Sequence, residues 1–210
     1  MLPGNHPNHA GRGPAASGGT MNRIPHTLGM ASIALMGLSL AAEDFQPLMK
    51  AARTTWPEKQ HIGVICDFRT SKAEVMALAA AAGEGAHITV ADTRVMEQAG
   101  AAAALLSAQR TDYVVLLPRD RNFRDGSFGA TVAVNRLASR GVPAVGTYPS
   151  AVKQGAVFSL GEGTQGQLLV TDRLIGTVDV ILPTQAALVE KAALVIQEKG
   201  KATVAVHLAQ

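Results

Sequence analysis

The stretch HIGVICDFRTSKAEVMALAAAAGEGAHITVA, residues 61–91, decides the fold class of this chain. It opens with HIGVIC (61–66), a continuous apolar run with β-branched residues, which is typical of a buried parallel strand. Residues 72–82 then follow a helical pattern, with Thr70 or Ser71 as the expected N-cap and glycines after the end. The closing HITVA predicts a second strand, so the stretch is a strand–helix–strand unit.

The same alternation of strand and helix patterns continues along the chain. Further strands are expected at YVVLLP (113–118), VPAVGT (142–147) and AVFSL (156–160), a final edge strand at TVAVHL (203–208), and helices at 43–55, 95–109, 128–139, from about residue 165, and at 184–199. Right-handed crossovers between such strands predict an α/β fold, a doubly wound parallel sheet of about five strands in the order 2-1-3-4-5 with helices on both faces. The segment 176–182 allows either strand or helix.

The composition fits one globular domain and excludes several classes of protein. Hydrophobic residues make up 47% of the 210 residues and aromatic ones only 4%, so we expect a core of aliphatic side chains. The net charge of +3 comes without a stripe of lysine and arginine, so we expect no nucleic-acid binding. The single cysteine, Cys66, cannot form an intramolecular disulfide or a cysteine metal cluster, and we expect no metal or other cofactor.

The N-terminal region has the pattern of an export signal. Residues 1–20 are rich in Gly, Pro, Asn and His and are expected to be disordered or a non-native extension; of the two alternative starts, Met1 and Met21, we expect Met21. Residues 21–42 combine a short positive segment, an apolar run and small-residue cleavage sites, as secretory signal peptides do. A buried helix or an uncleaved anchor is the alternative, although the run is short for a membrane span. We therefore expect a periplasmic or secreted protein with no stable membrane span once the signal is removed.

Four segments of the mature chain resemble a known family of exported proteins. They are IGVICDFRTS (62–71), DYVVLLPRD (112–120), GVPAVGTYPSAVKQGAVFSLGEG (141–163) and QLLVTDRLIGTVDVIL (167–182). In their order and spacing they are similar to the second lobe of periplasmic substrate-binding proteins of ABC transporters, of the aromatic-amino-acid-binding type with the type I periplasmic binding fold. The resemblance implies solute binding at the strand ends, a helix over 176–182, and cleft-facing roles for Asp120 and Thr147.

The resemblance divides the mature chain into a lobe and its flanks. The lobe covers 58–182, with an N-terminal helix and linker at 43–57 and a C-terminal helix and edge strand at 183–210. Members of the family bind their ligand between two lobes, whereas we expect no first lobe here, and the loop 121–129 is longer than theirs. A homodimer or a periplasmic protein partner is therefore the expected source of a second wall for the ligand.

The candidate site lies where the predicted strands end, because ligands of open α/β sheets bind outside the carboxyl ends of the strands. The residues expected to bind a ligand there are Asp67, Arg69, Thr70, Ser71, Arg94, Arg119, Asp120, Ser127, Thr147 and Tyr148. Arginine forks match carboxylates and phosphates, so a small anionic or amino-acid-like solute is the expected ligand. The alternative is that these arginines, together with Arg121 and Arg124, simply pair with neighbouring aspartates on a solvated edge.

No combination of side chains in the sequence predicts catalysis. Cys66 has no base near it in the sequence and is expected to be a buried, unreactive thiol. His61 and His87 begin strands at the far edge of the sheet, which argues against a catalytic triad. Phe123 and Phe128 are expected to form a lid or contact surface, with at least one of them in the core. We therefore expect a non-catalytic solute-binding or accessory protein, with an interaction scaffold for an enzyme or transport system as the alternative.

Overall fold

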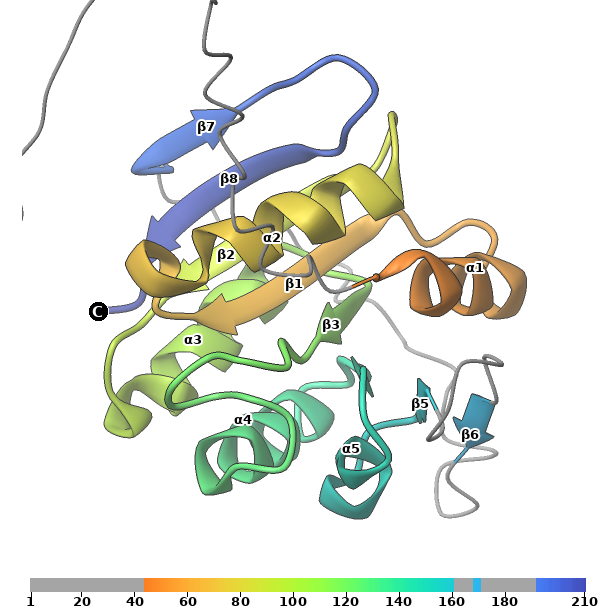
Figure 1. The fold of residues 1–210 in the computed structure, drawn as a ribbon. Coiled ribbons are helices and arrows are strands. Elements are labelled where there is room, and N and C mark those ends of the chain that lie inside the picture. Colours follow the sequence, from red (N-terminus) through yellow and green to blue (C-terminus); the bar gives the residue numbers. More distant parts are fainter. Residues whose placement is uncertain (1–43, 161–167, 171–191) are drawn as a thin grey trace, which may run out of the picture. The chain divides into compact units, whose positions relative to one another are not determined.

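The computed structural model describes residues 44–160, 168–170 and 192–210, which contain one sheet and its flanking helices (Figure 1). The strands are β1 (His61–Cys66), β2 (His87–Asp92), β3 (Tyr113–Val115), β4 (Ala144–Gly146), β5 (Phe158–Leu160), β6 (Leu168–Val170), β7 (Leu194–Ile196) and β8 (Thr203–Leu208). The helices are α1 (Gln46–Thr55), α2 (Phe68–Ala82), α3 (Ala99–Ala108), α4 (Phe128–Ala138) and α5 (Ser150–Gln154), with a 3-10 turn η1 (Met96–Gln98). The predicted α/β class is therefore confirmed.

Among the described residues the sheet has eight strands, in the order β6-β5-β4-β3-β1-β2-β8-β7. Strands β1 to β5 are parallel to their neighbours in this group and occur in the predicted order 2-1-3-4-5 in the middle of the sheet. Strand β8 pairs parallel with β2, while β6 and β7 pair antiparallel at the two edges. The sheet is thus mostly parallel, but it is mixed and wider than the sequence indicated.

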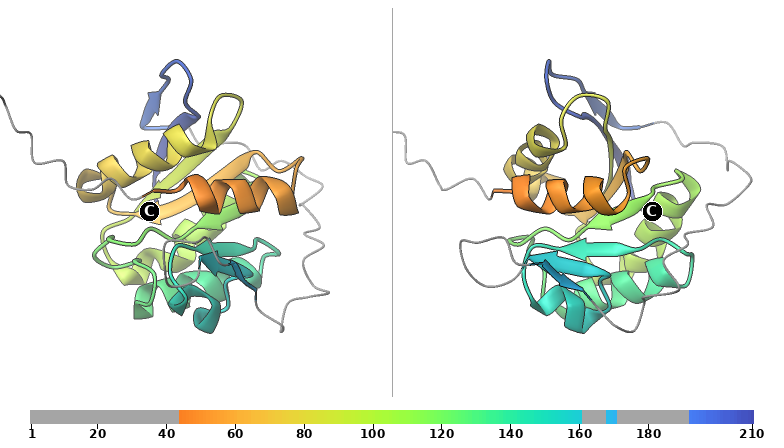
Figure 2. Two further views of the ribbon diagram at one scale, coloured as in Figure 1. Left: turned by 45° about the vertical axis from the view of Figure 1, so that its right-hand side comes forward. Right: turned by 90° about the vertical axis from the view of Figure 1, so that its right-hand side faces the viewer.

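Helices cover both faces of the sheet, as a doubly wound fold requires (Figure 1, Figure 2). The alternation of side chains along β1 explains this arrangement. Val64 and Cys66 contribute to the core that also contains residues of α1 and α2, whereas Ile65 contributes to the core formed with α3 and α4. Because both faces of the strand are buried, its sequence is a continuous apolar run rather than an alternating one.

The C-terminal part of the chain differs from the predicted helix at 184–199 and the predicted edge strand. Its described portion contains β7, which pairs antiparallel with β8 to form a hairpin. Gly200 lies in the connection with a φ of +77°, a left-handed conformation that carries no Cβ penalty in glycine. Strand β8 is therefore not an edge strand, since it lies between β2 and β7.

The helix expected from about residue 165 is wrong for residues 168–170, which form β6. The expected extension at 1–20, the signal peptide at 21–42 and the segment 176–182 lie outside the described residues. Within the part of the chain that the structure describes, no helix has the length and apolar character needed to cross a membrane.

Candidate functional site

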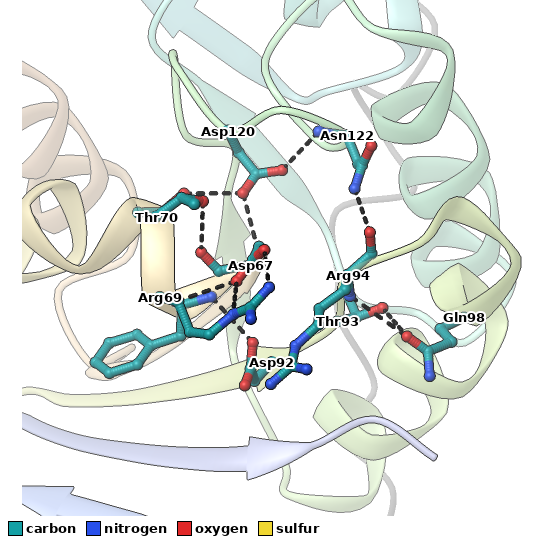
Figure 3. A network of polar contacts seen from close by, with 11 residues as sticks. Asp67, Arg69, Thr70, Asp92, Thr93, Arg94, Gln98, Asp120 and Asn122 are labelled. Carbon is teal, nitrogen blue, oxygen red and sulfur yellow. Dashed lines mark hydrogen bonds and ion pairs between the residues drawn. The ribbon is translucent and has the colours of Figure 1, made fainter.

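Asp120 lies at the carboxyl ends of β1, β2 and β3, which we call the strand-end edge (Figure 3). Its side chain is buried, and its Oδ2 accepts hydrogen bonds from the Asp67 N–H at 2.9 Å and the Ser71 hydroxyl at 2.8 Å. Its Oδ1 accepts hydrogen bonds from the N–H groups of Asn122 and Phe123 at 2.9 and 2.8 Å. The carboxylate therefore fastens the loop after β3 to the start of α2, which is the turn-forming role typical of aspartate.

A second buried carboxylate, Asp125, holds the segment after β4, and the sequence reasoning missed this role. Its Oδ2 accepts hydrogen bonds from the N–H groups of Thr147 and Tyr148 at 3.0 and 2.9 Å, and its Oδ1 accepts one from the Ser150 hydroxyl at 2.9 Å. Burial raises the pKa of Asp125, and these hydrogen bonds oppose that rise. Gly146 permits the close approach, because a Cβ there would lie 2.6 Å from Oδ2. The available signal was an Asp-Gly pair just before a helix cap.

The start of α2 corrects the predicted cap. Asp67, rather than Thr70 or Ser71, is the N-cap residue, and its Oδ1 accepts a hydrogen bond from the Arg69 N–H at 3.2 Å. The Thr70 hydroxyl donates to the Asp67 carbonyl oxygen, and the Ser71 hydroxyl donates to Asp120. Hydrogen bonds from the Arg69 side chain, and the ion pair it forms, hold the pKa of Asp67 below its usual value. Through these hydrogen bonds the four residues stabilise the junction between β1 and α2.

The arginines of the strand-end edge pair with its aspartates much less than their alternation in sequence suggested. Arg69 forms an ion pair with Asp67, and the Nε atom of Arg119 lies 3.9 Å from the Oε1 atom of Glu74 in α2. Of the arginines at this edge, Arg94, Arg121 and Arg124 are exposed and form no ion pair with other described residues. The expected pairing is limited because the buried aspartates of this edge accept hydrogen bonds from the backbone instead.

The loop before α4 places its two phenylalanines in opposite environments. Phe123 is 1% exposed and belongs to the core formed with α3 and α4, whereas Phe128 is 71% exposed. Ser127 is the N-cap of α4, as its position before the helix predicted, and its hydroxyl oxygen accepts a hydrogen bond from the Ala130 N–H at 3.1 Å. The prediction that at least one phenylalanine packs in the core is confirmed.

The two candidate residues that follow β4 differ in exposure. The side chain of Tyr148 is partly open to solvent, while Thr147 is buried. The Thr147 hydroxyl oxygen has no hydrogen-bond partner among the residues that the structure describes. A hydroxyl of this kind keeps its capacity both to donate to and to accept from a polar atom of a ligand.

Cys66 lies at the opposite end of β1 from the histidines His61 and His87. Cys66 is fully buried, and burial, together with nearby carboxylates, raises the pKa of its thiol well above the usual value. His61 and His87 are paired in register at the starts of β1 and β2, at the opposite end of these strands from the candidate site. In the described ranges, no group of three or more His, Cys, Asp or Glu side chains is arranged to hold a metal ion.

Comparisons with known proteins add a likeness in fold. No family model and no curated protein matches the chain. The crystal structure of a conserved domain protein from Vibrio cholerae is similar, with a TM-score of 0.52 and 16% sequence identity over 66% of this chain. The chain spans 56% of that protein. At this level of identity the similarity shows that this chain shares an α/β fold with it.

Proposed function

We propose that this chain is an exported, non-catalytic binding protein that holds a small anionic or amino-acid-like solute at the strand-end edge. The observation that carries the proposal is the opposite placement of charged groups there. The carboxylates of Asp120 and Asp125 are buried and accept hydrogen bonds from loop backbone. The arginine residues at this edge, by contrast, are exposed. In proteins generally, a guanidinium group binds a carboxylate or phosphate with two parallel N–H donors.

The resemblance to one lobe of ABC-transporter substrate-binding proteins supports the same function. Ligands of open α/β sheets bind at the carboxyl ends of the strands, where the buried Thr147 hydroxyl also lies. A second copy of the chain or a protein partner would supply an opposite wall for the ligand, as the second domain does in hinged binding proteins. The buried Cys66 thiol, with its raised pKa, favours binding over nucleophilic catalysis.

Export is part of this proposal and has its own test. The chain, translated from Met21 in a bacterial host, should be recovered from the periplasm with its N-terminus at about residue 43, as cleavage of a signal peptide requires. Mass spectrometry of the intact protein measures that N-terminus directly. Recovery from the cytoplasm with residues 21–42 still attached would contradict export.

Thermal unfolding of the full chain in the presence of amino acids, carboxylates, phosphates and nucleosides tests solute binding. A ligand at about 100 times its Kd adds about 2.7 kcal/mol to the free energy of unfolding. We expect stabilisation by one anionic class, and loss of it in a variant that combines Arg94→Ala with Arg121→Ala. Arg136→Ala, an exposed change in the last turn of α4, is the matched control. A well-folded protein that no compound stabilises would contradict the proposal.

A second candidate function is an interaction scaffold for a periplasmic enzyme or transport system. The observation that favours it is the exposure of Phe128 at the start of α4, beside the exposed apolar residues Val95 and Met96. Apolar side chains grouped on a surface are a feature of sites that contact other proteins. Stabilisation by a protein partner, with no effect of the solute panel, would favour this second function.

A further inference from the structure

Three apolar side chains are exposed together at the strand-end edge. Phe128 is 71% exposed, Val95 is 47% exposed and Met96 is 39% exposed. The packing of the first turn of α4 explains why Phe128 faces solvent. The next residue, Gly129, is buried so tightly that a Cβ there would lie 2.1 Å from the Asn122 carbonyl oxygen. Since Gly129 faces the loop, the side chain before it points outward.

These apolar side chains belong to two segments that lie against each other. The Asn122 side-chain amide donates a hydrogen bond to the Arg94 carbonyl oxygen, which joins the loop before α4 to the turn after β2 (Figure 3). A Cβ on Gly129 would lie 3.2 Å from Met96 Cγ, so Met96 packs beside the start of α4. Phe128 and the exposed apolar pair of the turn therefore form one surface.

Exposed arginines lie on the same two segments as these apolar side chains. We call the surface the Phe128 patch and define it by Arg94, Val95, Met96, Arg121, Arg124 and Phe128. Glu97, on the same turn as Met96, is an exposed carboxylate. Asp120 and Asp125, which lie in the same loop as two of the arginines, are buried in hydrogen bonds with the backbone. The patch therefore has an apolar centre and an excess of exposed positive charge.

We propose that the Phe128 patch docks an acidic peptide segment of a partner protein, with an apolar side chain of that segment seated on Phe128. The proposal rests on the second of the two functions above. Arginine forks pair with Asp and Glu carboxylates through two parallel hydrogen bonds. Aromatic residues, methionine and arginine are enriched in protein interfaces, and Met96 offers an adaptable apolar contact. The arginines would therefore favour a segment with Asp or Glu residues, and the apolar centre would favour a segment that also carries an apolar side chain.

The composition of the patch favours a peptide over a nucleic acid or an anionic membrane. Proteins that bind single strands stack successive bases on several aromatic rings, whereas the patch has one ring beside two aliphatic side chains. Segments that bind membrane surfaces present the apolar face of a helix flanked by Lys or Arg. The patch instead combines a loop, a turn and the start of a helix, and the exposed carboxylate Glu97 lies on the same turn as Met96.

Selection of a random peptide library, displayed on phage, against the immobilised full-length protein tests this proposal. We expect enriched peptides to carry Asp or Glu beside Leu, Ile or Phe, and their affinity, measured by fluorescence anisotropy, to fall with rising salt. Phe128→Ser should weaken binding about tenfold or more, as loss of an interface anchor does. The charge reversal Arg124→Glu should weaken it as well. Val195→Ser, an exposed apolar change on β7, and Arg136→Ser should leave affinity unchanged.

Several outcomes would overturn the proposal. These are a library that yields no enriched peptide, enriched peptides that lack net negative charge, and affinity that is equal in Phe128→Ser and in the Val195→Ser control. Tighter binding of a single-stranded oligo-dT or of phosphatidylglycerol vesicles, lost in the same patch variants, would assign the surface to nucleic acid or to membrane instead. If no peptide binds while a small anion stabilises the chain, solute binding stands and this inference fails; if neither binds, both fail.

Discussion

Replacement of Asp120 by alanine should destabilise the protein strongly, because this carboxylate accepts four hydrogen bonds that hold two loops together. Three of the donors are buried: the N–H groups of Asp67 and Phe123 and the hydroxyl of Ser71. A buried donor left without an acceptor costs about 1–3 kcal/mol. Since the exposed part of the loop can turn toward water, we expect the three donors together to lower the free energy of unfolding by about 4 kcal/mol, near the low end of this range.

Urea denaturation followed by circular dichroism measures this loss in the full chain. Asp120→Asn should cost about half as much as alanine, because its carbonyl oxygen can still accept from Asn122 and Phe123 while its NH₂ group opposes the Asp67 N–H. In a thermal scan the alanine variant should unfold roughly 8–16 °C below the parent protein. The control is Glu84→Ala, which removes an exposed carboxylate in the turn after α2 and should change the free energy of unfolding little.

The reasoning would be refuted if Asp120→Ala unfolded with a free energy within about 0.5 kcal/mol of the parent protein. It would also be refuted if asparagine proved more damaging than alanine. A further check is the coupling with Ser71. Ser71→Ala should cost less in the Asp120→Ala background than in the parent, because the hydroxyl then has no carboxylate to lose.

Other regions give predictions that are checked separately. Gly146→Ala should lower the melting temperature by several degrees, since its Cβ would lie 2.1 Å from the Ala151 Cβ, whereas Gly100→Ala in α3 meets nothing within 4 Å and should be neutral or stabilising. Cys66 should not react with a thiol reagent in the native protein and should react fully in denaturant; rapid native labelling would contradict its burial. Burial lowers the pKa of His61 below its usual value of 6.5. Below pH 6.5 the unfolded chain therefore takes up a proton at this histidine more readily than the folded protein does, so the free energy of unfolding falls as the pH decreases. His61→Gln should flatten that part of the stability–pH curve, and an unchanged slope would assign it to other groups.

The sequence predicted well those features that depend on local patterns. The apolar run at 61–66 and the helix that follows it indicated a strand–helix–strand unit, and β1 to β5 occur in the expected order within a wider sheet. Ser127 was correctly identified as the residue before a helix, because a serine cap acts within one turn of its own position. Such features follow from short-range sterics and hydrogen bonds, and therefore they can be inferred from neighbouring residues.

The prediction failed where distant pairing overrides local propensity. A helix was expected over 184–199, yet Leu194–Ile196 forms β7 because it pairs with β8 across the turn at Gly200. The strand 203–208 was expected at an edge, but pairing on both of its sides places it inside the sheet. Strand formation depends on the partner strand, and a single segment does not specify its partner.

For the candidate site, the sequence alone determined that polar and charged residues follow the strands and would meet at one edge of a parallel sheet. Only the tertiary structure decided which of them face solvent. Asp120 is turned inward by groups 49 and 53 positions away, Ser71 and Asp67, so its role depends on how the loops come together. With Asp120 and Asp125 hydrogen-bonded mainly to backbone donors, Arg94, Arg121 and Arg124 remain exposed, as does Phe128. A buried carboxylate is stable only when hydrogen-bond donors surround it, and the fold supplies such donors to Asp120 and Asp125. For this reason the aspartates have a structural role, while the arginines stay exposed to solvent.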